Sequence, residues 1–156
     1  IAVSADGQTL ASAGGWDRTV RIWDLARARE RHVVKGHTAQ VTSVAFGAGN
    51  AAVGSGSWDE TARIWDLGTG RELSRFAHHE ERVRPVTTVA ISADGDLLAT
   101  GDWQGSVCVW HIRSQSLIET LTAHQGPVRK VAFSPDGDRL AAAGSDGTVC
   151  LWRVER

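Results

Sequence analysis

The stretch GSWDETARIWD, residues 56–66, decides the fold because it carries two tryptophans seven positions apart, each followed by an aspartate. The same spacing occurs in AGGWDRTVRIWD (13–24) and in GDWQGSVCVWH (101–111). A fourth copy, GSDGTVCLW (144–152), keeps the second tryptophan and has Ser145 at the first position. These copies account for all seven tryptophans of the chain, so one unit is repeated along it.

The second tryptophan of each copy recurs at intervals of 42, 45 and 42 residues, at Trp23, Trp65, Trp110 and Trp152. A period of about 40–45 residues is typical of arrays of small four-stranded sheets. We therefore divide the single region 1–156 into four repeats, approximately 1–35, 36–77, 78–122 and 123–156.

Each repeat contains short runs that have the pattern of strands. In the second repeat the runs are VTSVAF (41–46), AAVGSG (51–56), TARIWD (61–66) and RELSRF (71–76). They alternate or are rich in β-branched residues, and none has the period of an amphipathic helix. The sequence therefore predicts an all-β fold of fifteen strands. A sheet this small cannot bury both of its faces alone, so we expect each sheet to pack against the next.

Composition and charge narrow the classes of function. The chain has 156 residues, of which 42% are hydrophobic and 22% charged, as is ordinary for a globular domain. Its net charge of −1 gives no reason to expect nucleic acid or an anionic membrane surface as a partner. No apolar run approaches the roughly 18 residues of a membrane-spanning helix.

The two cysteines, Cys108 and Cys150, each lie two residues before a repeated tryptophan and so occupy the same position in successive repeats. Packed sheets lie roughly 10 Å apart, whereas a disulfide needs Cα atoms within about 7 Å of each other. We therefore predict buried free thiols, which favours a reducing compartment and a cytoplasmic location. A metal site at these cysteines lacks convergent histidines or carboxylates, so we expect neither a metal nor another cofactor.

These landmarks resemble the WD-repeat (WD-40 type) β-propeller family, whose signature is a Gly-His pair followed by a Trp-Asp end. The second repeat matches fully, with Gly36-His37 and Trp65-Asp66. Elsewhere the signature is degraded, as in His78-His79, Ala123-His124, Trp110-His111 and Trp152-Arg153. A tryptophan at the first position of each pair resembles WD repeats of bacterial type, which often have tryptophan there. The resemblance covers essentially the whole chain.

The resemblance implies a structural hydrogen-bond tetrad of His, Ser or Thr, Asp and Trp in each repeat. The second repeat carries all four, at His37, Ser55, Asp59 and Trp65. The other repeats carry part of the set: His79, Thr100 and Trp110; His124, Asp146 and Trp152; and Ser12, Asp17 and Trp23. The third repeat has Gln104 in the aspartate position and the fourth has Ala142 in the hydroxyl position.

Recurring His, Ser and Asp residues also invite comparison with a hydrolase triad. A triad occurs once, at one site, whereas these residues return in every repeat at positions that the family buries. Buried imidazole, hydroxyl and indole groups each need hydrogen-bond partners, which a tetrad supplies. We therefore expect no catalytic residues and no enzymatic activity.

The resemblance implies a binding face where the loops between the second and third strands meet the loops leading into the first strand. The first tryptophans fall in this set, and we expect them to form an aromatic rim: Trp16, Trp58 and Trp103. Further residues are expected beside that rim on the same face: Gln40, Thr42, Thr87, Arg129, Arg82 and Arg84. The alternative is that these tryptophans only pack over the turn of the neighbouring sheet.

Propellers of this family usually have seven blades, so four repeats imply an incomplete or half propeller. We expect its open faces to be covered by the remaining blades of the same polypeptide or by a second copy of the chain. A self-closed ring of four blades is disfavoured because blades of this type are wedged for wider rings.

The expected function is that of a non-catalytic scaffold that binds a protein or peptide partner within a larger regulatory or multi-subunit protein. Two alternatives stay open. The chain is a half-propeller that homodimerises into a closed ring, or it is an enzymatic or small-ligand propeller with a site in the central channel.

Overall fold

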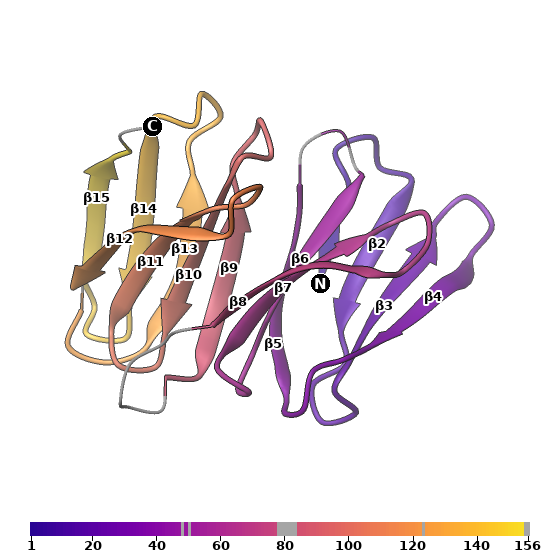
Figure 1. Cartoon of the computed structure of the whole chain (residues 1–156), viewed down its shortest axis with the longest axis horizontal. Coiled ribbons are helices and arrows are strands. Elements are labelled where there is room, and N and C mark those ends of the chain that lie inside the picture. The colour runs from indigo at the N-terminus through magenta and orange to yellow at the C-terminus, as the bar shows by residue number, and fades with distance from the viewer. Residues whose placement is uncertain (48, 50, 78–83, 123, 155–156) are drawn as a thin grey trace.

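The computed structural model describes residues 1–47, 49, 51–77, 84–122 and 124–154. These residues form fifteen strands in four antiparallel sheets, which confirms the all-β prediction and the expected arc of propeller blades. Figure 1 shows the sheets following one another in chain order, from sheet 1 in indigo to sheet 4 in yellow. Within the described residues, no helix has the length and apolar character needed to cross a membrane.

Within each sheet, every strand pairs with the next strand along the chain. Sheet 1 contains β1 (Ala2–Val3), β2 (Thr9–Ala13), β3 (Thr19–Asp24) and β4 (Arg29–Lys35). Sheet 2 contains β5 (Val41–Phe46), β6 (Ala52–Ser57), β7 (Thr61–Asp66) and β8 (Glu72–Ala77). Sheet 3 contains β9 (Val86–Ile91), β10 (Leu97–Asp102), β11 (Ser106–His111) and β12 (Ser116–Thr122). Sheet 4 contains β13 (Val128–Phe133), β14 (Arg139–Gly144) and β15 (Val149–Arg153).

The hairpin turn between the first two strands of a sheet is set by a Ser-x-Asp-Gly sequence. In sheet 3 the Ser92 hydroxyl donates to the Asp94 carboxylate at 2.5 Å and accepts the Leu97 N–H at 2.9 Å. Gly95 follows with a φ of +81°, a conformation that favours glycine. The same contacts occur at Ser4 and at Ser134, so sheets 1, 3 and 4 use the same turn between their first two strands.

The apolar core lies between the sheets rather than at one centre. Val20 and Ile22 of sheet 1 pack with Val53 and Trp65 of sheet 2. Equivalent residues form a second cluster between sheets 2 and 3 and a third between sheets 3 and 4. Each internal interface therefore joins one face of a sheet to the opposite face of the next sheet. This is expected because a single small sheet cannot bury both of its apolar faces by itself.

Glycine allows the inner strands of neighbouring sheets to approach closely. A Cβ on Gly56 would lie 2.7 Å from a methyl group of Val86, and one on Gly101 would lie 2.6 Å from a methyl group of Val128. Real Cβ atoms do not tolerate such distances, so β6 and β10 need glycine where β9 and β13 pack against them.

The last sheet leaves one face uncovered. Val149 and Leu151 on β15 are 72% and 63% exposed, whereas the residues at the Leu151 position in sheets 2 and 3, Ile64 and Val109, are 3% and 4% exposed. The interior sheets bury this face against their successors. The described part of the chain therefore presents an apolar sheet face beyond β14 and β15.

Candidate functional site at the tryptophan rim

The second sheet contains a complete His-Ser-Asp-Trp tetrad. His37 Nδ1 lies 2.8 Å from Asp59 Oδ2, and His37 Nε2 lies 2.7 Å from Ser55 Oγ. Trp65 Nε1 donates to the same hydroxyl at 2.7 Å. Because a carboxylate only accepts, Nδ1 carries the imidazole proton, and the Ser55 hydroxyl donates to Nε2 while accepting from the indole. All four side chains are therefore committed to one internal network.

Asp59 anchors the loops that carry the rim. Burial alone raises the pKa of the Asp59 carboxyl, but hydrogen bonds from His37, Thr61 and the Thr38 N–H outweigh it and hold the pKa well below its usual value. The Thr61 hydroxyl donates to Asp59 at 2.6 Å and the Thr38 N–H donates at 3.0 Å. The carboxylate thus joins the loop before β5 to the loop between β6 and β7, in which Trp58 lies.

Sheets 1 and 3 keep the part of the tetrad that fixes the second tryptophan. Trp23 Nε1 donates to Ser12 Oγ at 3.0 Å, and Trp110 Nε1 donates to Thr100 Oγ1 at 3.1 Å. Asp17 accepts from the N–H and hydroxyl of Thr19, and these bonds lower the pKa of its carboxyl. The predicted tetrad member His79 lies outside the described residues.

Sheet 3 has a buried ion pair close to the glutamine that stands in the aspartate position of the tetrad. Asp102, not Gln104, is the buried carboxylate of this sheet, and it accepts the N–H groups of Gln104 and Ser106. Arg84 Nη1 lies 3.3 Å from Asp102 and 2.9 Å from Ser106 Oγ. Arg84, which the sequence analysis placed on the binding face, is half-buried and forms an ion pair with a fully buried carboxylate. Its contact with a partner stays a prediction.

Sheet 4 shows the consequence of a missing hydroxyl. His124 Nδ1 lies 2.8 Å from Thr148 Oγ1 and 3.3 Å from Asp146. The Gln125 N–H and Thr148 hold the pKa of the Asp146 carboxyl below its usual range. His124 Nε2 is buried and has no hydrogen-bond partner among the described residues, because Ala142 stands where sheet 2 has Ser55.

Trp58 and Trp103 meet at the rim between sheets 2 and 3. Their rings lie edge to face with centroids 5.9 Å apart and an interplanar angle of 75°. The two side chains stay 42% and 46% exposed. Their backbone N–H groups donate to the carbonyl oxygens of Gln40 and Pro85, so each indole is carried by a loop tied to the strand beside it.

A pocket of about 240 Å³ opens at this pair and is lined by Trp58, Pro85, Trp103 and Gln104. Most of its surface is apolar. We name these four residues the rim pocket. Exposed tryptophans around an apolar hollow are the side-chain chemistry most enriched at binding hot spots.

Trp16 does not join the other two tryptophans. It is 83% exposed and makes no ring contact within the described residues. The first repeat has one more residue between Ser12 and Trp16 than the others, and Gly15 in this stretch has a φ of +59°. The expected rim of three tryptophans is therefore a pair with a separate third indole.

The other predicted rim residues have different surroundings. The Thr42 hydroxyl lies 2.7 Å from the Val86 carbonyl oxygen of the next sheet, and the Thr87 hydroxyl contacts the Val128 carbonyl oxygen in the same way. These two hydroxyls link neighbouring sheets, and their contact with a partner stays a prediction. Gln40 is half-buried, Arg129 is exposed, and Arg82 lies outside the described residues.

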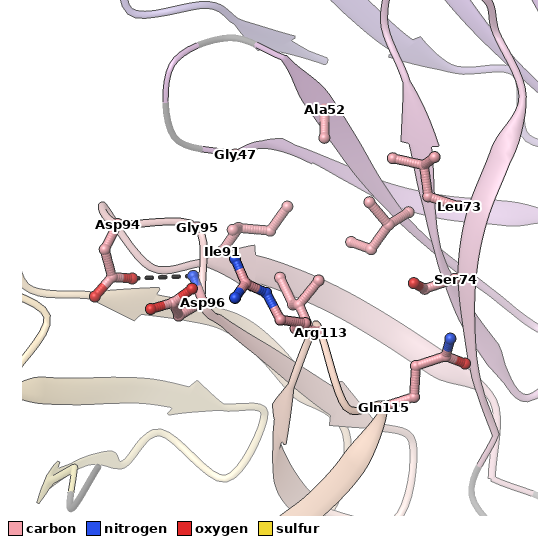
Figure 2. A pocket seen from close by; sticks show the side chains of 12 residues that line it. Gly47, Ala52, Leu73, Ser74, Ile91, Asp94, Gly95, Asp96, Arg113 and Gln115 are labelled. Atoms are coloured by element: carbon pink, nitrogen blue, oxygen red, sulfur yellow. Dashed lines mark hydrogen bonds between the residues drawn. The ribbon is translucent and has the colours of Figure 1, made fainter.

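A second hollow, of about 520 Å³, lies at the opposite ends of sheets 2 and 3. Figure 2 shows Asp94 and Asp96 on one side of it near Arg113, with Leu73 and Ser74 on the other. The Asp94 carboxylate is bound by its own turn, accepting from Ser92 and from the Asp96 N–H. This hollow follows from the turn geometry and lacks exposed aromatic side chains.

No group of three or more His, Cys, Asp or Glu among the described residues is arranged to hold a metal ion. Cys108 and Cys150 are both free cysteines, as predicted, but only Cys108 is buried, whereas Cys150 is half-buried. Within this part of the chain, the rim pocket is the arrangement that best fits a binding site.

Small antiparallel sheets packed in series, with a tryptophan at the same position in each, are typical of the β-propeller class of repeat protein. The chain belongs to the WD40 family: the model for the WD domain, G-beta repeat, matches residues 1–24, 28–66, 70–111 and 115–153. Each matched unit after the first begins near the outer strand of one sheet and ends with the third strand of the next, so residues 28–66 contain β4 to β7.

Two relatives have similar sequences. A periodic tryptophan protein 2 homolog of Dictyostelium discoideum is 30% identical over 132 residues, which are 81% of this chain and 14% of the relative. Autophagy-related protein 16 of Arabidopsis thaliana is 28% identical over 128 residues, which are 81% of this chain and 25% of the relative. The chain thus spans a quarter or less of the length of these relatives.

Proposed function

We propose that this chain is a non-catalytic WD40 scaffold whose rim pocket binds a protein or peptide partner. The observation that carries the proposal is the contact between Trp58 and Trp103, two half-exposed indoles that enclose an apolar pocket. Burying such side chains in a partner's surface is favourable, and tryptophan dominates the energetics of many interfaces.

The loops beneath the pocket support this role because they are already ordered. Asp59 ties the Trp58 loop to His37, and Asp102 accepts the Gln104 N–H immediately after Trp103. A pre-ordered surface loses little conformational entropy on binding. The same internal hydrogen bonds argue against catalysis by His37, Ser55 and Asp59, since each of their polar groups is occupied.

The wider setting follows from the family and from length. The relatives are several times longer than this chain, which supports a role within a larger regulatory or multi-subunit protein. Free thiols at Cys108 and Cys150 support a cytoplasmic location.

The exposed face at Val149 and Leu151 favours a second candidate role, the half-propeller that pairs with another copy of itself.

A displayed peptide library tests the binding role. Peptides are selected on the 156-residue chain, and their affinities are then measured for a Trp58→Ala, Trp103→Ala variant and for Trp16→Ala as the matched control. We expect the double variant to lose at least about tenfold in affinity, while its thermal unfolding stays close to that of the parent chain and Trp16→Ala binds normally. Unchanged affinity together with a large drop in melting temperature would show that the pair only packs.

A further inference from the structure

The charges around the rim pocket indicate what kind of group it accepts. Its four lining residues carry no ionisable side chain. Two charged residues next to the lining are held internally: Arg84 forms an ion pair with Asp102, and Asp59 accepts a hydrogen bond from His37 and lies 3.4 Å from the Arg63 guanidinium. An entering group therefore meets an apolar wall whose four described lining residues supply no carboxylate to hold a cation.

The volume of the pocket and the hydrogen-bonding groups around it further restrict the class of ligand. A volume of about 240 Å³ lies below the roughly 300–1,000 Å³ of pockets for drug-sized molecules, so the pocket suits a few residues of a chain. The indole N–H groups of Trp58 and Trp103 donate to no acceptor within the described residues. The mostly apolar lining of the pocket offers few acceptors to a bound peptide.

An ordinary peptide would bury backbone N–H groups against this lining, and each unpaired buried donor costs free energy. Proline has no N–H, presents a flat apolar ring and keeps its carbonyl oxygen as an acceptor. Proline-rich segments in the polyproline II conformation are also extended before binding, so they lose little entropy.

We propose that the rim pocket binds a proline-containing segment in the polyproline II conformation. A proline ring packs against the faces of Trp58 and Trp103, and a neighbouring carbonyl oxygen accepts a hydrogen bond from an indole N–H. This inference rests on the proposed function and names the ligand class for the same site.

The test follows the tryptophan indole N–H resonances of the ¹⁵N-labelled 156-residue chain during titration. The probes are an oligoproline peptide, a glycine–serine peptide of equal length and a peptide containing trimethyl-lysine. We expect oligoproline to shift the resonances of Trp58 and Trp103, assigned by single Trp→Phe variants, and to leave Trp16 in place. Trp103→Ala should weaken oligoproline binding at least tenfold, and Trp58→Phe, which keeps an aromatic wall but lacks the N–H, should weaken it less.

Equal shifts with the glycine–serine peptide, or a response to trimethyl-lysine alone, would overturn the proline assignment. If oligoproline causes no shift but library-selected peptides still need Trp58 and Trp103, the ligand class is wrong and the proposed function stands. If no peptide depends on the two tryptophans, both proposals fail. The backbone amide spectrum of each variant serves to show that it is folded.

Discussion

The hydroxyl that accepts the indole N–H has an equivalent position in all four sheets. Ser12, Ser55 and Thr100 fill that position and fix the tryptophan opposite them. Ala142 fills it in sheet 4 and leaves the ring nitrogen of His124 buried without a partner among the described residues. The network of sheet 4 therefore lacks the one hydroxyl oxygen that completes the network of sheet 2.

Restoring that oxygen should stabilise the chain. In Ala142→Ser the new hydroxyl can donate to His124 Nε2 and accept from Trp152, as Ser55 does in sheet 2. We expect the free energy of unfolding to rise by about 1 kcal/mol, measured by urea denaturation. Ala141→Ser, on the neighbouring position of β14, is the control and should change stability little. Equal changes in the free energy of unfolding for the two variants would contradict the role given to the missing hydroxyl at position 142.

Acid should destabilise the tetrad of sheet 2. The folded-state pKa of Asp59 lies below its ordinary value of 3.8. The contribution of the Asp59 carboxylate to the free energy of unfolding is therefore fully present above pH 3.8 and is lost as the pH falls from 3.8 toward the folded-state pKa. We expect the urea midpoint to fall between about pH 5 and pH 2, and Asp59→Asn to lower the midpoint at neutral pH and to flatten this dependence.

Asp17→Asn is the matched control, because it removes the equivalent carboxylate of sheet 1. Its side chain is 44% exposed, so solvent screens its interactions and its removal should alter the pH dependence less. A larger effect from Asp17 than from Asp59 would show that burial is not what makes this position important.

At the residue level, sequence spacing predicted the tetrad of sheet 2 but not the ion pair of sheet 3. Alignment placed Gln104 at the aspartate position, whereas the acting carboxylate is Asp102. Its partner Arg84 lies eighteen positions earlier in the chain. A carboxylate at the end of the buried run LLATGD was the available clue, since a buried charge needs a partner.

At the level of elements, the four strands of the second repeat were predicted within one residue, because alternation and β-branched residues mark them in the sequence. The run at 41–46 coincides with β5, and the run at 51–56 is shifted by one residue from β6. Sequence could not reveal the change of register next to the repeated tryptophan, which sheets 1, 2 and 3 share. Such bulges depend on how two strands pair, and that pairing leaves no mark in a single strand.

Close contact between inner strands gives a prediction for β10. In Gly101→Ala the new methyl group would meet Val128 and Thr88, so the strands must separate or the side chains must shift. We expect a loss of about 1–3 kcal/mol of stability from this overpacking, measured by chemical denaturation. Gly47→Ala is the control, because its Cβ meets only ordinary contacts of 3.5 Å or more. A neutral Gly101→Ala would show that the sheets can move apart at little cost.

For the whole molecule, the repeat length predicted the number of sheets and their order, because each sheet must cover its neighbour. The pairing of Trp58 with Trp103 but not with Trp16 was not predictable. It depends on loop conformations near Gly15 and on the distance between sheets, which spacing along the chain does not encode.

The uncovered face of sheet 4 should govern how the 156-residue chain behaves in solution. Val149 and Leu151 occupy positions that interior sheets bury, so we expect association that increases with concentration. A Val149→Lys, Leu151→Glu variant should remain folded and shift the sedimentation profile toward the monomer. Val33→Lys, on the partly exposed β4, is the control and should leave association unchanged. Identical profiles for all three chains would exclude this face as the contact.

Each sequence unit after the first is offset from the sheets by one strand. The same unit therefore contributes strands to two neighbouring sheets. A unit such as residues 28–66 supplies the outermost strand of one sheet and three strands of the next. Excising that unit would strip a strand from sheet 1 as well as most of sheet 2. Under tension applied to the chain ends, unravelling should then spread across sheet boundaries instead of stopping at them.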